Sequence, residues 1–196
     1  MNICIFASGS GTNFKAIIDA RKSGIISSSI SLLITNNSDC GAVSIAEENS
    51  IPVFHISRKV YPDCSDEEYS NLFLNKFEEY NIDFIVLAGY MKMLDVRIIR
   101  KYPNRIINIH PALLPNFGGK GMYGMNVHRA VIASGVKESG VTIHYVNEKY
   151  DEGKIIIQKK VEVTKDDDAE SLQKKVLKLE HRYYAEVIRG IEKSEL

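Results

Sequence analysis

The chain reads Arg105-Ile106-Ile107-Asn108-Ile109-His110-Pro111-Ala112-Leu113-Leu114-Pro115 just past its midpoint. The apolar run that leads into this stretch is typical of a buried β-strand. Asn108 and His110 are two residues apart, so on an extended strand their side chains point to the same side. In open α/β sheets the carboxyl ends of the strands border the crevice in which ligands bind. The stretch therefore predicts an α/β sheet with Asn108 and His110 at its binding edge.

The same stretch suggests a type of chemistry. Pro111 and Pro115 restrict the backbone that leaves the strand, which gives the two polar side chains a stiff support. An amide that donates hydrogen bonds beside an imidazole that exchanges protons makes up half of an acyl-transfer site. The alternative is a polar strand end that runs into a turn, and for an Asn-x-His pattern alone that alternative is the commoner one.

Short apolar runs alternate with longer amphipathic runs along the chain, as in a wound α/β sheet. Strands are expected at 3–7, 29–35, 52–56, 84–88, 105–109, 141–146 and 155–163, and helices at 13–22, 41–49, 65–80, 95–101, 127–134 and 169–191. The last two strands are joined by the short segment 147–153, which favours a hairpin-like excursion over a parallel crossover. We predict a Rossmann-like, mostly parallel wound sheet with helices on both faces and an antiparallel excursion in the second half.

Composition limits the class of protein. The 196 residues are 44% hydrophobic and 26% charged, which suits one globular domain over 1–196. Lys+Arg and Asp+Glu are equal at 25 each, so net charge attracts neither nucleic acid nor a membrane. The three cysteines form no CxxC motif and the histidines show no zinc spacing, so no metal is expected. With no signal peptide and no apolar run of about 20 residues, the expected location is cytoplasmic.

The loop Ser8-Gly9-Ser10-Gly11-Thr12-Asn13 follows the first expected strand and opens a helix. Glycines let a backbone approach a ligand closely, and a helix start offers free N–H groups, so the loop is a candidate phosphate cradle. It is not a Walker loop, because no lysine follows Gly11, and Phe14 replaces the third glycine of a dinucleotide fingerprint. The alternative is a simple turn in which Thr12 or Asn13 caps the helix.

Three further segments are candidates, each with a plainer alternative. Asp151-Glu152-Gly153 can orient or deprotonate His110 if Asp151 faces it, or it is a solvated turn. His144 shares a strand face with Thr142 and is equally explained as a half-buried, hydrogen-bonded histidine. The segment Met91-Lys92-Met93-Leu94 follows the strand at 84–88 and can line an apolar pocket, although ordinary core packing explains it by itself.

Together these motifs resemble the glycinamide ribonucleotide formyltransferase family of de novo purine synthesis, over nearly the whole chain. The matching elements are Ser8–Asn13, Ala88-Gly89-Tyr90-Met91, Asn108–Pro115, Thr142-Ile143-His144 and Asp151-Glu152-Gly153. The resemblance implies 10-formyltetrahydrofolate as co-substrate and formyl donor, glycinamide ribonucleotide as acceptor, and no metal. It also implies a phosphate- and nucleotide-binding half over 1–100 and a folate-binding and catalytic half over 101–196. A monomer or a weak homodimer is expected.

The resemblance also assigns roles to residues. It implies a catalytic set of Asn108, His110 and Asp151, with His144 and Thr142 in secondary roles. The phosphate of the ribonucleotide is expected to bind at Gly11, Thr12 and Asn13, and its amine is expected to contact Glu180. The folate is expected to bind at Met91, Lys92, Met93, Leu94 and Tyr150. Lys92 stands where relatives often carry arginine, so it lacks the planar two-pronged donor. The glycine-rich loop 117–125 is longer than in some relatives, which leaves its ligand contacts open.

Related activities share the Asn-x-His and Asp core. A methionyl-tRNA formyltransferase is expected to carry a further C-terminal domain and a basic stripe, and this chain ends soon after its last expected helix. A formyltetrahydrofolate hydrolase is expected to carry an added N-terminal domain, whereas the first strand here begins near residue 2. A non-catalytic nucleotide-binding module requires Asn108, His110 and Asp151 to be incidental, and their joint presence argues against it.

Overall fold

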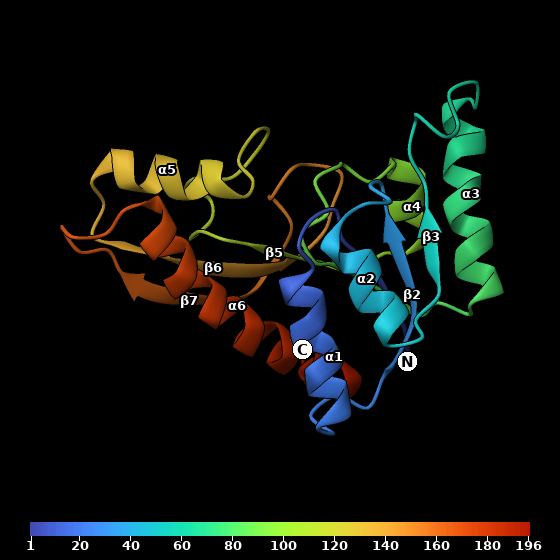
Figure 1. Cartoon of the computed structure of the whole chain (residues 1–196), viewed down its shortest axis with the longest axis horizontal. Coiled ribbons are helices and arrows are strands. Elements are labelled where there is room, and N and C mark those ends of the chain that lie inside the picture. The colour runs from blue at the N-terminus through green and yellow to red at the C-terminus, as the bar shows by residue number, and fades with distance from the viewer. The chain divides into compact units, whose positions relative to one another are not determined.

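The computed structural model describes all residues, 1–196, as two compact units, Met1–Ile106 and Ile107–Leu196, each of which is described by itself. Figure 1 labels their helices and strands. Every expected element is present, with ends that differ by no more than three residues from the expected ones. The expected α/β class, a Rossmann-like wound sheet with an antiparallel excursion, is confirmed.

The first unit is a parallel sheet. Its strands are β1 (Asn2–Phe6), β2 (Ser29–Thr35), β3 (Val53–His55) and β4 (Phe84–Leu87), in the order β3-β2-β1-β4. The chain runs from β1 to β2 on one side and later places β4 on the other side of β1. The winding direction therefore reverses at β1, and ligands of open α/β sheets bind at such a reversal. The Ser8–Asn13 loop and the segment 88–94 both leave the sheet there, joined by the Ser8 N–H donating to Gly89 O at 3.1 Å.

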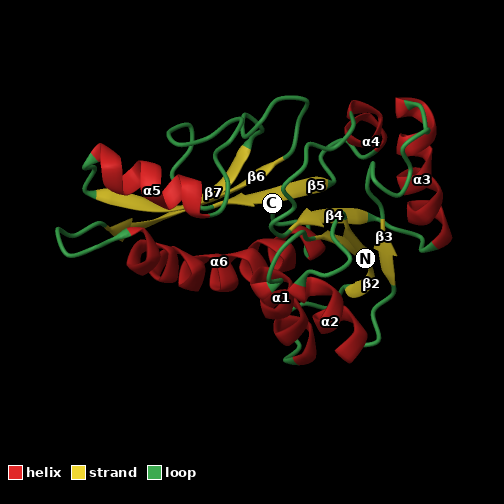
Figure 2. Cartoon of the chain, turned by 45° about the horizontal axis from the view of Figure 1, so that its top comes forward, coloured by secondary structure: helices red, strands yellow, loops and turns green.

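Helices cover both faces of this sheet. They are α1 (Thr12–Lys22), α2 (Gly41–Glu48), α3 (Asp66–Glu79) and α4 (Val96–Lys101). α1 contacts α2 and α3 contacts α4, and Figure 2 shows the two pairs on opposite faces. Phe6 of β1 is fully buried, with its ring stacked on Phe73 at a centroid distance of 5.9 Å.

The second unit is antiparallel. β5 (Ile106–His110), which starts at the last residue of the first unit, pairs with β6 (Glu138–Tyr145), and β6 pairs with β7 (Ile155–Glu162). The expected hairpin-like excursion is therefore confirmed. The helices are α5 (Met125–Ser134) and α6 (Ala169–Glu192); α6 contacts α5, β6 and β7. It begins at a capping box in which the Asp168 carboxylate accepts from the Ser171 N–H at 2.7 Å.

The largest difference from expectation is the start of β6, which begins three residues before the expected strand. The expected strand begins at Val141, directly after Gly140, and glycine inside a strand weakens it. Here the close approach of β7 requires it: a Cβ built on Gly140 would lie 1.9 Å from Lys159 O. The strand continues through the glycine because only a residue without a side chain lets β6 and β7 pair at that point.

Candidate active site

The candidate catalytic side chains of the second unit start at the paired ends of β5 and β6. Asn108 lies opposite His144, and His110 lies opposite Thr142. Facing residues of antiparallel strands point to the same side, so all four side chains share one face of the sheet. The expectation that Asn108 and His110 project to the same side is met. His110, Thr142 and His144 are buried, and Asn108 is partly buried.

Asn108 and His144 are hydrogen-bonded to each other. The Nδ2 of Asn108 lies 3.2 Å from Nε2 of His144, whose Nδ1 lies 2.9 Å from Tyr145 O. A carbonyl oxygen only accepts, so Nδ1 of His144 carries the proton and its Nε2 accepts from the Asn108 amide. This bond uses one of the two amide N–H groups of Asn108 and orients the amide, so the second N–H is available to a ligand oxygen.

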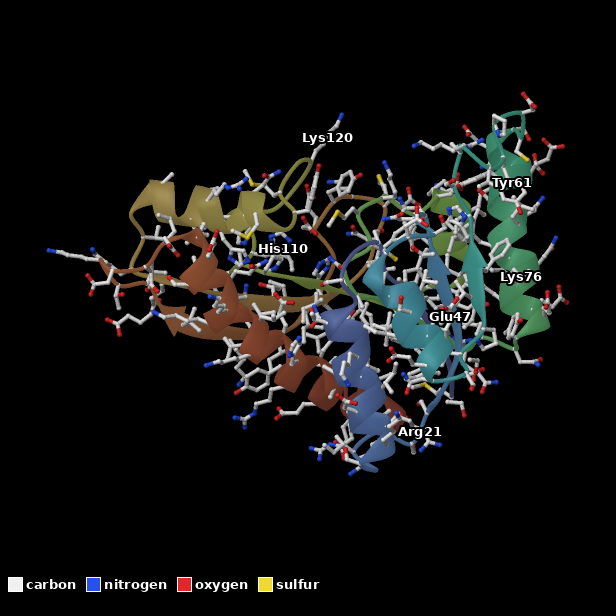
Figure 3. All side chains as sticks on the ribbon, in the orientation of Figure 1. Arg21, Glu47, Tyr61, Lys76, His110 and Lys120 are labelled. Carbon is white, nitrogen blue, oxygen red and sulfur yellow. The ribbon has the colours of Figure 1, made fainter.

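His110 is held by a carbonyl on one side and faces a carboxylate on the other. Its Nε2 lies 2.8 Å from Phe117 O, and its Nδ1 lies 3.6 Å from Oδ2 of Asp151. Since the carbonyl accepts from Nε2, the neutral ring has its lone pair on Nδ1, toward Asp151. Figure 3 labels His110 together with Lys120, which lies at the exposed tip of the loop that precedes α5. The arrangement leaves His110 with a basic nitrogen next to a negative charge.

Asp151 lies between His110 and His144. It therefore faces His110, as it must if it is to orient or deprotonate that histidine. Its Oδ1 lies 3.6 Å from Nε2 of His144, and its Oδ2 accepts from the Gly119 N–H at 2.9 Å. Its backbone φ is 56°, and Phe117 has φ 57°, a left-handed conformation that costs a non-glycine residue about 1–3 kcal/mol. Two separate segments, the loop after β5 and the β6–β7 turn, thus hold the residues that face His110 in an unfavourable backbone conformation, which is common at functional sites.

The electrostatics favour a neutral His110 beside a charged Asp151. Burial lowers the pKa of His110 and the nearby His144 lowers it further, which outweighs the Asp151 carboxylate and the Phe117 carbonyl that raise it. Burial raises the pKa of Asp151, but the neighbouring His144, the hydrogen bond from the Gly119 N–H and the nearby His110 hold it below its usual range. The lowered pKa favours the unprotonated form of His110 without ligands, so any proton that His110 carries has to arrive during the reaction.

The Ser8–Asn13 loop belongs to the first unit. Gly11 is the N-cap of α1 with φ 76°, and a Cβ there would lie 2.8 Å from Cα of Ala42, so both conformation and space require glycine. No side chain caps α1, which contradicts the alternative that Thr12 or Asn13 caps it. Thr12 is exposed and Asn13 is buried. The N-cap position of α1 therefore carries no side chain that would cap the helix, which suits a phosphate cradle.

Ser8 links this loop to the segment after β4. Its hydroxyl lies 2.5 Å from Oδ1 of Asn36 and accepts from the Met91 N–H at 3.2 Å. In that segment Met91 and Met93 are each 48% exposed and Lys92 is exposed, whereas Leu94 is buried. Core packing therefore accounts for Leu94 alone, and the two methionines present an apolar surface.

The remaining expected residues lie in the second unit. Tyr150 is 45% exposed in the β6–β7 turn, directly before Asp151. Glu180 is buried on α6, one turn before Tyr184, whose hydroxyl donates to Ile107 O of β5 at 3.3 Å. Burial, together with the negative charge of Glu180, raises the pKa of Tyr184. This places Glu180 in the part of α6 that borders β5.

Sequence reasoning missed three groups of this site: the Phe117 carbonyl, the Gly119 N–H and the side chain of Gln158. The first two are backbone groups, which carry no signature in a sequence. Gln158 lies opposite Thr142 in β7, a placement that depends on strand register. The only available signal was its polarity among the isoleucines of that strand.

The comparisons with known proteins agree with this geometry. The model of the family described as formyl transferase matches residues 1–188. The chain belongs to the formyl transferase family. A relative from Bacillus subtilis named phosphoribosylglycinamide formyltransferase is 35% identical, over 95% of this chain and 92% of its own. The crystal structure of phosphoribosylglycinamide formyltransferase from Bacillus halodurans has a TM-score of 0.90 at 39% identity, and covers 97% of this chain and 95% of that one.

A plant member of the family shows a difference in length. The Arabidopsis thaliana relative, named as a chloroplastic phosphoribosylglycinamide formyltransferase, is 44% identical over 96% of this chain. The chain spans 64% of that relative, and 60% and 61% of those from Vigna unguiculata and Glycine max. None of the helices is both long and apolar enough to cross a membrane. No group of three or more His, Cys, Asp and Glu side chains is placed to hold a metal ion.

Proposed function

We propose that this formyl transferase moves the formyl group of 10-formyltetrahydrofolate to the amine of glycinamide ribonucleotide, in de novo purine synthesis. The products are N-formylglycinamide ribonucleotide and tetrahydrofolate. The observation that carries the proposal is the convergence of Asn108, His110 and Asp151, with one amide N–H of Asn108 uncommitted and Nδ1 of His110 next to a carboxylate. The names of the relatives supply the acceptor.

The mechanism follows from these atoms. The ribonucleotide amine attacks the formyl carbon, so a new C–N bond forms and negative charge develops on the formyl oxygen. The free N–H of Asn108 stabilises that oxyanion. Nδ1 of His110, directly or through water, takes the amine proton, and the resulting imidazolium is stabilised by Asp151. The proton then passes to the folate nitrogen as the old C–N bond breaks, which leaves His110 neutral again.

The other expected residues select the two substrates. The start of α1 at Gly11, Thr12 and Asn13 would bind the ribonucleotide phosphate, because the backbone N–H groups and the dipole of a helix start favour an anion. Glu180 would bind the glycinamide amine. Met91, Lys92, Met93, Leu94 and Tyr150 would contact the folate, with the exposed methionines supplying apolar surface for its ring.

A spectroscopic formyl-transfer assay tests the proposal. The wild-type protein is given 10-formyltetrahydrofolate with glycinamide ribonucleotide, water alone or charged initiator tRNA as rival acceptors. Transfer to the ribonucleotide is expected to be fastest by orders of magnitude, and transfer to water or tRNA alone contradicts the proposal. Thermal stabilisation by ATP or NAD but not by folates would instead favour a nucleotide-binding module.

The proposal includes a metal-independent reaction by a cytoplasmic monomer or weak homodimer. The balanced charge of the chain supports partners that are small molecules rather than nucleic acid. Activity that survives exhaustive chelation supports a metal-independent reaction. Sedimentation equilibrium tests whether the protein is a monomer or a weak homodimer. Fractionation tests location, and recovery in an organelle, as the names of the plant relatives state for them, would contradict a cytoplasmic site.

A further inference from the structure

The turn that follows His110 is held by two side chains from neighbouring strands. His110 of β5 lies opposite Thr142 of β6, and Thr142 lies opposite Gln158 of β7. Facing residues in antiparallel strands share a side, so the three side chains form one row across the sheet. Thr142 is fully buried at the centre of the row and Gln158 lies at its exposed end.

The hydrogen bonds of this row are saturated. The Thr142 hydroxyl donates to Ala112 O at 2.6 Å and accepts from the Leu114 N–H at 3.0 Å. Nε2 of Gln158 donates to Leu114 O at 2.8 Å and to the Thr142 hydroxyl at 2.9 Å. A hydroxyl has one donor and two acceptor sites, and a side-chain amide nitrogen has two donors. Both groups therefore use their full capacity to hold the turn between Ala112 and Leu114.

The segment that begins at His110 also contains a residue that contacts the His110 ring. Three residues after Leu114, the Phe117 carbonyl accepts from Nε2 of His110 at 2.8 Å. We propose that Thr142 and Gln158 are positioning residues for formyl transfer: they hold the turn so that the Phe117 carbonyl keeps the proton on Nε2 of His110 and leaves Nδ1 basic. This inference rests on the proposed function for its kinetic consequence, but its consequence for the His110 ring holds without any substrate.

The position of the proton on the His110 ring matters because other titratable groups lie close to the ring. Asp151 and His144 are the titratable groups on the side of His110 away from Phe117, and the buried His128 of α5 also lies within electrostatic range. If the carbonyl moves, a neutral His110 can place its proton on Nδ1, where it donates toward Asp151. Nδ1 then can no longer take the amine proton. The carbonyl is also one of two groups that raise the pKa of His110, so its loss lowers that pKa further.

Four variants separate positioning from general stability. Thr142→Val keeps the shape but loses every hydrogen bond, and Thr142→Ser keeps the hydroxyl. Gln158→Met keeps the length without the N–H donors, at an exposed position where folding is expected to tolerate it. Lys160→Gln is the matched control, since Lys160 is exposed two residues along β7 and bonds only Glu138, at 2.6 Å. The readouts are the tautomer and pKa of His110 by NMR of its ring nitrogens in the ligand-free protein, and kcat and KM in the formyl-transfer assay.

We expect Thr142→Val to mix the two tautomers of His110, to lower its pKa, and to lower kcat by about tenfold to a hundredfold, because small displacements of a catalytic group cost that much. KM is expected to change by less than about twofold, since substrate contacts remain. Gln158→Met has the same effects on a smaller scale, Thr142→Ser restores the wild-type behaviour, and Lys160→Gln leaves it unchanged.

The proposal is overturned if folded Thr142→Val or Gln158→Met keeps the Nε2–H tautomer and the wild-type kcat, or if kcat falls while the tautomer and pKa of His110 stay as they were. If Thr142→Val does not fold, Gln158→Met decides by the same criteria. A wild-type protein that does not formylate glycinamide ribonucleotide contradicts the proposed function instead. The NMR result on the His110 ring is then still decisive for the positioning role.

Discussion

Asn108 shows how one residue can serve two partners. One N–H of its amide is bound by Nε2 of His144, and the other is free to meet the developing oxyanion. Loss of one such donor costs on the order of 2.7–4 kcal/mol of barrier, or about a hundredfold to a thousandfold in kcat. We therefore expect Asn108→Ala to lower kcat by that factor in the formyl-transfer assay. Asn108→Asp is the matched variant, because it keeps the shape without any N–H, and near-normal turnover by either variant contradicts the assignment.

Asp151 tests the electrostatic part of the mechanism. Its carboxylate raises the pKa of His110, so Asp151→Asn should lower that pKa further. In the proposed mechanism His110 acts unprotonated, so activity rises as pH rises through its pKa, and the acid limb of the kcat/KM profile should move to lower pH. The plateau should fall by about a hundredfold or more, because the imidazolium loses its counter-charge. Glu152→Gln, at an exposed neighbour, is the control, and an acid limb that stays in place or moves to higher pH argues against the scheme.

At the scale of elements, local pattern was sufficient to predict most of the fold. α3 and α6 begin where a polar side chain can cap them, at Ser65 and Asp168, and both caps are present. β2 has the expected bounds because its apolar residues, Ile30 and 32–34, are followed by the polar residues Thr35, Asn36 and Asn37. The shared face of Asn108 and His110 follows from the two-residue period of a strand alone.

Register is what the sequence could not provide. The contact of Asn108 with His144 depends on how β5 pairs with β6, and the place of Asp151 depends on an irregularity in the β6–β7 pairing between Ile143 and His144. A register shift of one residue would reverse the side of every residue in β6. The proximity of Asp151 to His110 is thus a property of the folded sheet, and only the resemblance to a family anticipated it.

Gly153 tests how firmly the β6–β7 turn holds Asp151. A Cβ on Gly153 would lie 1.7 Å from Tyr145 O, a backbone atom that cannot move without breaking the hairpin. We expect Gly153→Ala to destabilise the protein by roughly 1–3 kcal/mol, as overpacking does, and to lower kcat because Asp151 is displaced. Urea unfolding and the formyl-transfer assay measure the two effects. Lys154→Ala changes an exposed neighbour without a clash and should alter neither, whereas a stable, active Gly153→Ala would show that the turn adapts.

At the scale of the whole molecule, the candidate residues divide between the two units. The phosphate loop and the Met91–Leu94 segment belong to the first unit, while Asn108, His110, Asp151 and Glu180 belong to the second. The family match spans both units. The candidate catalytic side chains therefore all belong to the second unit, whereas the candidate phosphate loop belongs to the first.

The buried histidines make the stability of the molecule depend on pH. Burial lowers the pKa values of His110, His128 and His181, that of His128 to about 4. In the unfolded chain these groups bind protons below about pH 6.5, so unfolding takes up protons in this range and becomes easier as pH falls. The part of the free energy of unfolding that depends on these histidines being neutral is fully present above the pKa that they have in the unfolded chain. It is lost progressively between about pH 6.5 and about pH 4.

His128 allows this pH dependence to be tested. It is 2% exposed, and its Nδ1 has no hydrogen-bond partner, so an apolar side chain of similar size should fit. Between about pH 7 and about pH 5 the wild-type protein should lose more free energy of unfolding than His128→Leu, by on the order of 1–2 kcal/mol. Urea unfolding at the two pH values measures the difference, with His55→Gln of the partly exposed β3 as control. Equal losses in the wild-type and His128→Leu proteins would mean that His128 takes up no extra proton on unfolding, and the acid sensitivity would then have to come from other groups, such as His110 and His181.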